Sequence, residues 1–348
     1  MSCNHIVFVV MDSCRYDGFV AAKTPNIDRL GEAERRYSYA SWTAPSHHAF
    51  AMGMLPHASP KHVFASEVYK EEFALWRDRT GYHEISFQDF LPDLSLPKVL
   101  RNIGYRTVAK VSMPVLNKNT LISRDFDEYK LMPNHNDFGG MIREMEFPDE
   151  PHYYFLNLGE THYPYMLSGE GLPHISGVHG ALKSMDKAQK PAAKEVEITE
   201  ELMRRLQNQQ IKCIEYVDGL MGKLMDMTPP NTHFIVTADH GELFGEEGYF
   251  GHGPVMHEKC FEVPFLEGRL ARRRALPNRH GSAALPAGPA EILHLTGERD
   301  ARPASAGVRT AGAMPVQCRA AGGFVAWIGW ADIGERRGRP PRIDARAR

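Results

Sequence analysis

Two apolar runs, far apart in the chain, each end in a carboxylate, and this pattern constrains the fold more than any other feature. The first run, Ile6 to Met11, is followed by Asp12; the second, Phe234 to Ala238, is followed by Asp239 and His240. Short apolar runs of this kind predict buried strands of a parallel sheet. Ligands of open α/β sheets bind outside the carboxyl ends of the strands, so these polar side chains are candidates for one shared site.

The identity of these side chains points to a metal ion. Taken singly, a carboxylate after a strand is more often a helix cap or an ordinary loop residue. Two such endings, one with a histidine beside it, favour a divalent cation, because carboxylate and imidazole are suitable ligands for one.

A third polar strand ending and a long helix complete an alternating α/β pattern. The run His152–Leu158 predicts a strand, and His162 follows it closely. A lone histidine near aromatic residues is usually a structural hydrogen-bonding residue. Because this one is expected at the same sheet edge, the functional and the structural interpretation have about equal weight. Apolar spacing from Ile198 to Met227 predicts an amphipathic helix that ends before two prolines. Lys110, in another expected strand, is interpreted as a solvated edge lysine.

Thr43 lies at the start of a predicted helix. Pro45, close to the beginning of the apolar segment from Trp42 to Met52, is typical of a first helical turn. The Thr43 hydroxyl would then lie at the positive end of the helix, where backbone N–H groups can hold an anion. The alternative is that Thr43 is simply the N-cap residue.

Five segments in this order resemble the sulfatase family of the alkaline phosphatase superfamily. The likeness spans about Ile6 to Gly268. The joint occurrence of five ordered motifs is far more specific than any one of them. The segments are Val10–Asp17, Thr24–Leu30, Thr43–Ser46, Thr161–Tyr165 and Asp239–Gly241.

The resemblance implies an α/β fold, with a mixed, mostly parallel central sheet covered by helices on both faces. It also implies that Asp12, Asp239 and His240 are metal ligands. Thr43 matches the nucleophile, which also touches the metal, and His162 matches a histidine that faces the substrate.

The departures from the family pattern limit which nucleophile and which reaction we expect. Sulfatases carry a Cys or Ser that is oxidised to formylglycine, whereas this chain has Thr43, with His47 in place of an arginine. Ser13 stands where a second metal-binding aspartate is usual. A threonine nucleophile is similar to the phosphoethanolamine and glycerophosphate transferases of the superfamily, and His252 resembles the late histidine of their loop.

We therefore expect a metal-dependent hydrolase of phosphate or sulfate esters that uses Thr43 through a covalent intermediate. His162 and His252 are expected to bind the ester oxygens or to protonate the leaving group, and Arg15 and His47 are the expected substrate-binding groups. One divalent ion (Mn²⁺, Zn²⁺, Mg²⁺ or Ca²⁺) is expected; a second, with Glu160 as an added ligand, stays open. The alternatives are a sulfuric ester hydrolase without formylglycine, a phosphotransferase acting on a small alcohol, and a degraded, non-catalytic family member.

Composition limits the partners. The 348 residues carry a net charge of −2, which argues against obligate binding to a polyanion such as nucleic acid. The partner expected from the ester chemistry above is a small anionic ester. No segment approaches the ~20 apolar residues of a membrane span. Without a signal-peptide pattern, and with five scattered cysteines, the expected location is cytoplasmic. The sequence does not predict an oligomeric state.

The composition changes near residue 268. Residues 1–268 are expected to form the catalytic domain, with 57–97 as a surface excursion and 168–197 as a mobile insertion or a lid. Residues 269–348 hold 15 Arg, 6 acidic residues and no Lys, and are rich in Ala, Gly and Pro. We interpret this segment as a frame-shifted or disordered tail; a basic tail for anionic partners, with a net charge of +9, is the alternative.

Overall fold

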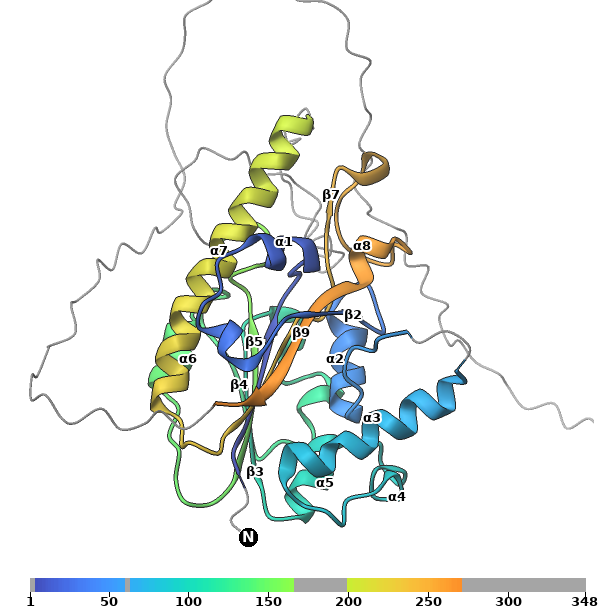
Figure 1. Ribbon diagram of the computed structural model, residues 1–348, viewed down its shortest axis with the longest axis vertical. Helices are drawn as coiled ribbons and strands as arrows, with labels where there is room; N and C mark the ends of the chain where they lie inside the picture. Colours follow the sequence, from blue (N-terminus) through green and yellow to red (C-terminus); the bar gives the residue numbers. More distant parts are fainter. Residues whose placement is uncertain (1–3, 60–62, 166–198, 271–348) are drawn as a thin grey trace, which may run out of the picture.

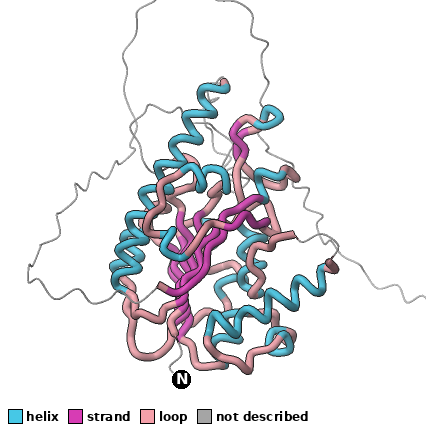
Figure 2. Tube along the Cα trace, in the orientation of Figure 1, coloured by secondary structure: helices cyan, strands magenta, loops and turns pink. Residues whose placement is uncertain are grey.

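A twisted seven-stranded sheet lies between two layers of helices (Figures 1 and 2). This computed structural model describes residues 4–59, 63–165 and 199–270. β1 pairs in parallel with β5 and β6, and β3 pairs in parallel with β5 and β4, whereas β9 is antiparallel to both β6 and β2. The strands, in order across the sheet, are β2 (Glu34–Tyr37), β9 (Glu262–Arg269), β6 (His233–Thr237), β1 (Ile6–Met11), β5 (His152–Leu158), β3 (Arg106–Val111) and β4 (Glu128–Leu131).

The helices divide between the two faces of the sheet, as the sequence resemblance predicted. α1, α6 and α7 cover one face, and α2 to α5 cover the other (Figure 1). The helices are α1 (Tyr16–Ala21), α2 (Thr43–Met52), α3 (Ala65–Thr80), α4 (Phe87–Phe90), α5 (Leu96–Asn102), α6 (Phe138–Arg143), α7 (Glu200–Met227) and α8 (Glu258–Phe261). Short 3₁₀ turns lie at Ile27–Leu30, Pro114–Leu116, Leu121–Ser123 and Glu246–Gly248.

Strand β1 shows why the core has two halves. Successive side chains of a strand point to opposite faces. Val7 and Val9 accordingly belong to the core under α7, while Ile6 and Phe8 belong to the core under α2 to α5. Every residue of β1 is buried, which is typical of a central parallel strand.

The long helix α7 confirms the helix expected over 198–227. Its N-cap residue Thr199 accepts a hydrogen bond from the Leu202 N–H, and the helix ends at Met227, before two prolines. All seven apolar positions of the predicted stripe are buried: Leu202, Leu206, Cys213, Val217, Leu220, Met221 and Leu224.

Of three expectations about peripheral segments, one needs correction and two concern residues outside the described ranges. Residues 57–97 are not a mere surface excursion, because Phe73, Trp76 and Phe90 are buried in the core and the Trp76 indole donates to the Gly53 carbonyl at 2.9 Å. The expected lid at 168–197 lies outside the described residues. So does the tail beyond Leu270, while β9 runs one residue past the expected border at 268.

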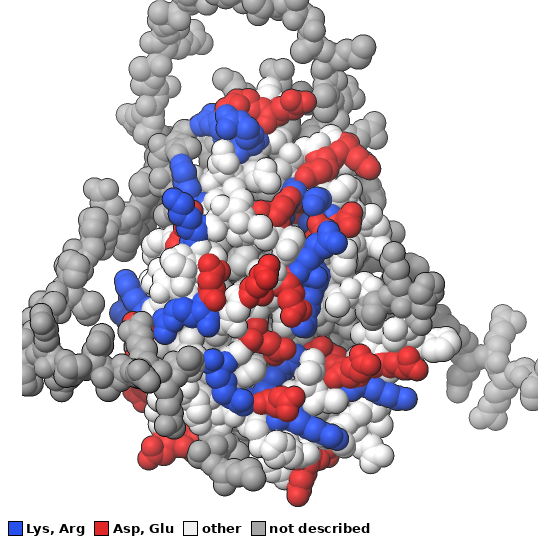
Figure 3. Space-filling view, in the orientation of Figure 1, with Lys and Arg blue, Asp and Glu red and all other residues white. Residues whose placement is uncertain are grey.

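Figure 3 shows acidic and basic side chains interspersed over one face of the molecule. The described residues of that face present no continuous basic surface, in keeping with the net charge of −2. No helix among the described residues is long and apolar enough to cross a membrane.

Candidate metal and catalytic site

Strand register brings the polar strand endings together. Val10 of β1 pairs with Thr237 of β6, so Asp12 and Asp239, each two residues further along, meet at the carboxyl edge of the sheet. On the other side of β1, Asn157 of β5 also pairs with Val10. Three neighbouring parallel strands therefore deliver polar side chains to one place, as expected for this class of fold.

The cluster consists of Asp12, Asp239 and His240, whose ligand atoms all lie within 4.8 Å of one another. His240 Nε2 is 3.7 Å from Asp12 Oδ1 and 3.4 Å from Asp239 Oδ2. All three side chains are fully buried. No other group of this kind occurs within residues 4–59, 63–165 and 199–270. The structure thus brings together the three side chains predicted as metal ligands.

The donor atoms of this cluster fit a divalent cation. The His240 Nδ1–H donates to the Gly241 carbonyl at 2.8 Å, which leaves the Nε2 lone pair directed at the carboxylates. Asp239 Oδ2 is buried without a hydrogen-bond partner. Asp12 Oδ2 accepts from Asn157 Nδ2 at 3.0 Å, which fixes the orientation of that carboxylate.

The electrostatics of the cluster are unbalanced without a cation. Burial, and then the charge of Asp12, raise the pKa of Asp239 well above its ordinary value. Burial also acts to raise the pKa of Asp12, but His162, His240 and His47 together hold it below its usual value. Burial, and next His252, lower the pKa of His240 well below its usual value, so this imidazole is neutral. Two buried carboxylates beside a neutral ring are the charge pattern that a divalent ion neutralises.

Thr43 is the first residue of α2 and lies against the cluster. Its Oγ1 is 3.3 Å from His240 Nε2. The N-cap position is held by Trp42, with no side-chain capping bond, so the alternative that Thr43 is the N-cap residue is wrong. The hydroxyl therefore lies both beside the candidate ligands and at the positive end of a ten-residue helix.

Several supporting groups were not predicted from the sequence. The Ser13 N–H donates to Asp239 Oδ1 at 3.1 Å, from a backbone in the left-handed region (φ +61°). The Thr161 hydroxyl donates to the Asp12 carbonyl at 2.7 Å. Asn157 carried a usable signal, because it interrupts an otherwise apolar and aromatic strand one residue before its end. The left-handed turn at Ser13 left no such mark in the sequence.

His162 and His252 also lie at the cluster. Their ring centroids are 5.0 Å apart, and the His252 ring is 4.3 Å from that of His240. Burial lowers the pKa of His162, and its Nδ1 donates to the Tyr163 carbonyl at 2.5 Å. The two histidines predicted as acid groups are thus brought next to the predicted metal ligands, and their catalytic roles stay predictions.

Arg15 and His47, the predicted substrate-binding residues, have structural partners here. The buried Arg15 guanidinium bonds Asp17 at 2.5 Å and Glu246 at 2.6 Å. His47 is fully buried one turn along α2, and its Nδ1 donates to the Thr43 carbonyl at 2.8 Å. Burial lowers the pKa of His47 to about 4, so it is neutral. These contacts are all with other groups of the protein, and direct contact of Arg15 or His47 with a substrate stays a prediction.

Lys110 differs from its sequence-based interpretation, whereas a second ion with Glu160 as an added ligand stays a prediction. Lys110 is not a solvated edge lysine: β3 is an interior strand, and Lys110 is buried and bonds Glu144 at 2.8 Å. Glu160 lies outside the ligand cluster, and its Oε1 accepts the Phe138 N–H at 2.7 Å.

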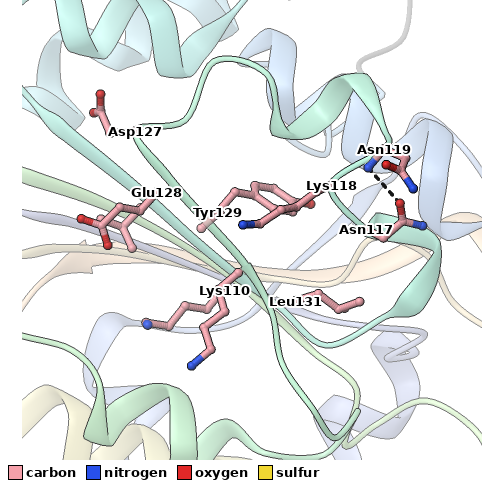
Figure 4. Close-up of a pocket in the computed structure, with 11 residues that line it drawn as sticks. Lys110, Asn117, Lys118, Asn119, Asp127, Glu128, Tyr129 and Leu131 are labelled. Atoms are coloured by element: carbon pink, nitrogen blue, oxygen red, sulfur yellow. Dashed lines mark hydrogen bonds between the residues drawn. The ribbon is translucent and has the colours of Figure 1, made fainter.

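A hollow of about 720 Å³ lies away from this site, along β3 and β4 (Figure 4). Lys110, Asn117, Lys118 and Tyr129 are among its lining residues, and Asn117 Oδ1 accepts the Asn119 N–H at 2.9 Å. None of the candidate ligands or catalytic groups lines it. The chemistry therefore has to be argued from the sheet edge and not from this hollow.

Several solved structures are similar to this chain over most of its length. The C-terminal periplasmic domain of EptC from Escherichia coli matches 78% of this chain and 73% of its own, at 14% identity and a TM-score of 0.44. The corresponding domain of the phosphoethanolamine transferase EptC from Campylobacter jejuni matches 77% and 80%, at 14% identity and 0.44. A 2-O GAG sulfatase matches 77% and 64%, at 13% identity and 0.49. At such identities none of them assigns a reaction to this chain.

The comparison with these solved structures contradicts the cytoplasmic location expected from the sequence. The EptC structures are periplasmic domains. A missing signal-peptide pattern and scattered cysteines are indirect indications of a compartment. We assign no location in place of the one expected.

The family assignment rests on the sequence itself. No curated protein matches the chain. The family model described as Sulfatase matches residues 4–267, a range that contains β1, α2, β5 and β6 with the polar residues at their ends. That match covers well over half of the 348 residues. The chain therefore belongs to the sulfatase family.

Proposed function

We propose that this protein is a metal-dependent phosphoric ester hydrolase in which Thr43 is the nucleophile. The observation that carries the proposal is the 3.3 Å separation between Thr43 Oγ1 and His240 Nε2, within a buried cluster of two carboxylates. An alcohol at this position is close enough to share a cation with Asp12, Asp239 and His240.

The position of Thr43 also favours an anionic substrate. As the first residue of α2, it lies among backbone N–H groups that have no side-chain cap. The N-terminus of a helix attracts anions through these N–H groups and through the helix dipole. A phosphoryl group attacked by Thr43 would therefore meet hydrogen-bond donors where its charge develops.

Asp12, Asp239, His240 and Thr43 would hold the divalent ion. When bound, such an ion supplies a Lewis acid that polarises the phosphoryl oxygen and lowers the pKa of the Thr43 hydroxyl. Asn157 and the Ser13 N–H hold the two carboxylates in orientation, through bonds of 3.0 and 3.1 Å.

The reaction takes two displacements. In the first, Thr43 Oγ1 forms a bond to phosphorus, the bond from phosphorus to the ester oxygen breaks, and the hydroxyl proton of Thr43 is lost while the leaving oxygen gains one. In the second, water forms a bond to phosphorus, the bond from phosphorus to Thr43 Oγ1 breaks, and Thr43 regains a proton while the water loses one and phosphate is released. His252 and His162 lie beside the cluster and would carry these protons, a role that typically contributes ~10²–10⁴-fold in rate.

The test uses the full chain with Mn²⁺, Zn²⁺ or Mg²⁺ and paired aryl phosphate and aryl sulfate esters. We expect phosphate esters to be hydrolysed faster and Thr43→Ala to abolish turnover. Intact mass spectrometry after a quench should detect a phosphoryl adduct on Thr43. Thr120→Ala is the matched control, because the Thr120 hydroxyl donates to the Asn117 carbonyl and is no part of the ligand cluster.

Full activity in Thr43→Ala would refute the nucleophile, and faster turnover of the sulfate ester would favour a sulfuric ester hydrolase. Threonine cannot be oxidised to formylglycine by the usual route, which is why the phosphoryl reaction is the one proposed. Addition of a small alcohol tests the transferase alternative, since a new phosphate ester would then form from the same phospho-Thr43.

A further inference from the structure

A small hairpin above the carboxyl edge of the sheet places two residues face to face. β7 (Leu243–Phe244) and β8 (Phe250–Gly251) are antiparallel, with Leu243 opposite Gly251. One step further along the same register, Glu242 lies opposite His252. The hairpin stands at the end of the sheet where β1 and β6 finish (Figure 1).

Glu242 and His252 make direct contact there. Glu242 Oε1 lies 3.2 Å from His252 Nδ1, and the Glu242 side chain is fully buried. Ser13 Oγ is also near the same nitrogen, at 3.4 Å. A carboxylate oxygen accepts in such a contact, so the proton between the two side chains belongs to Nδ1. Nε2 then remains as the ring nitrogen available to the site.

The other oxygen of Glu242 has its own donor. The Tyr165 hydroxyl donates to Glu242 Oε2 at 2.5 Å. Burial, followed by the charge of Glu242, raises the pKa of Tyr165 well above its usual value, so this hydroxyl stays protonated. Both Glu242 oxygens are thus bonded, as a buried carboxylate requires.

The surroundings hold this arrangement still. Phe244 and Phe250 of the hairpin pack with Tyr163, Tyr165 and the N-terminal part of α7 in a separate apolar cluster. The Arg15 guanidinium donates to the Glu242 carbonyl at 3.2 Å. Apolar packing therefore holds the hairpin against α7, and the hydrogen bond from Arg15 holds it against the segment that follows β1.

We propose that Glu242 is a positioning residue for His252: it holds the imidazole in the Nδ1–H tautomer, with Tyr165 supporting the carboxylate. This inference rests on the proposed function, because it assigns the way in which His252 is made ready to carry a proton to the leaving oxygen. A carboxylate on one ring nitrogen fixes the tautomer and orientation of the other.

The first test observes the imidazole itself. The zinc-loaded full chain, labelled with ¹⁵N-histidine, gives ring signals in which His252 is identified by its loss in His252→Ala. We expect the Nδ1–H tautomer with a downfield proton. In Glu242→Gln the neutral acceptor should move that proton upfield, and in Glu242→Leu the Nε2–H form should appear.

The second test uses the leaving group. His252→Ala should slow an alkyl phosphate ~10²–10⁴-fold, and a 4-nitrophenyl ester much less, because a good leaving group needs no proton. Glu242→Leu should show the same selectivity with a loss of ~10–100-fold, as is usual for groups that orient a functional histidine. Glu242→Gln should retain part of the rate. Adding Glu242→Leu to His252→Ala should cost nothing further.

Glu247→Leu is the matched control, since Glu247 is an exposed carboxylate in the turn of the same hairpin. Wild-type protein with His252 in the Nε2–H form, or an imidazole proton unchanged in Glu242→Gln, would overturn the proposal. Equal losses on both esters would do the same, because a merely structural role has no leaving-group preference. The ring signals need no turnover, so inactivity on both esters refutes the proposed function while the NMR result still decides the role of Glu242.

Discussion

A group of buried charged side chains lies at each end of strand β6. We call the group that contains a positively charged side chain balanced, and the group that has none among the contacts described unbalanced. At the start of β6, the Arg79 guanidinium bonds Glu72 at 2.9 Å and Glu267 at 2.8 Å, and His233 lies 3.3 Å from Glu267. At the far end, Asp239 lies with Asp12 beside a neutral imidazole, with no buried cation of the protein's own among the contacts described.

The pKa shifts show what this difference means. Burial acts to raise the pKa of Glu267, but His233 and Arg79 hold it far below its ordinary value, so this carboxylate is ionised and satisfied. The pKa of Asp239 is instead raised well above its ordinary value by burial and by Asp12. The Arg79 group is complete as a structural element. The Asp239 group has no such cation among the contacts described, and the metal ion that we propose would supply the positive charge.

The largest effect should come from breaking the unbalanced group. Asp239→Asn removes a charged ligand, and we expect ester hydrolysis to fall ~10³-fold or more, since several kcal/mol of charge stabilisation are lost. Without metal, the variant should unfold no more easily than the wild type, because the repulsion from Asp12 is relieved. Activity and metal content measured beside Asp226→Asn, which alters a surface carboxylate paired with Arg29 at 3.6 Å, check this. Normal metal content in Asp239→Asn would contradict it.

Removing the cation of the balanced group should instead lower stability and leave activity unchanged. Arg79→Met leaves Glu72 and Glu267 without their cation, and we expect the free energy of unfolding to drop by about 3–5 kcal/mol. Activity per folded molecule should remain, because this group lies at the other end of the sheet. Urea unfolding of Arg79→Met and of Arg77→Met, an exposed neighbour on α3, tests the assignment. A loss of activity without a loss of stability would reverse the roles given to the two ends.

Removing the cation should reveal the unbalanced group directly. A ligand present at 100 times its Kd stabilises the native state by about 2.7 kcal/mol, so chelation of the metal-loaded protein should lower its Tm. Asp239→Asn should show no such shift, whereas Arg79→Met should keep it. Differential scanning fluorimetry with and without chelator measures both. A chelator response in Asp239→Asn would place the ion elsewhere.

The smallest effect concerns Glu160, a buried carboxylate whose Oε2 has no hydrogen-bond partner. Burial raises its pKa from 4.5 to about 7. The folded state therefore favours the protonated form, so its contribution to stability is full below pH 4.5 and is lost as pH rises through 7. Glu160→Gln should remove this loss, stabilising the protein at pH 8 by about 1–3 kcal/mol relative to wild type.

Unfolding midpoints at pH 5 and pH 8 decide this last prediction. Glu150→Gln is the control, because the Glu150 side chain is 68% exposed. An equal pH dependence in wild type and Glu160→Gln would show that Glu160 titrates normally in the folded protein.

Much of the fold could be predicted from the sequence because local pattern and tertiary structure agree there. β1 and β5 have the bounds that their apolar runs indicated, and α7 has the expected buried stripe. The segment 57–97 was misjudged, because its buried residues Phe73, Trp76 and Phe90 are spread among charged neighbours that hide the periodicity. Lys110 was misjudged because nothing local shows that Glu144 lies beside it.

By itself the sequence determined which chemistry the chain can offer: strands ending in Asp12 and in Asp239–His240, and a threonine at a helix start. Residue type and local spacing are fixed by the chain, and they suffice for this. Only the tertiary structure decided which groups meet. The contacts of Asn157 with Asp12, of Ser13 with Asp239 and of Tyr165 with Glu242 join residues 77 to 226 positions apart. Such contacts depend on strand register and hairpin packing, because a pairing shifted by one residue would turn each side chain to the opposite face.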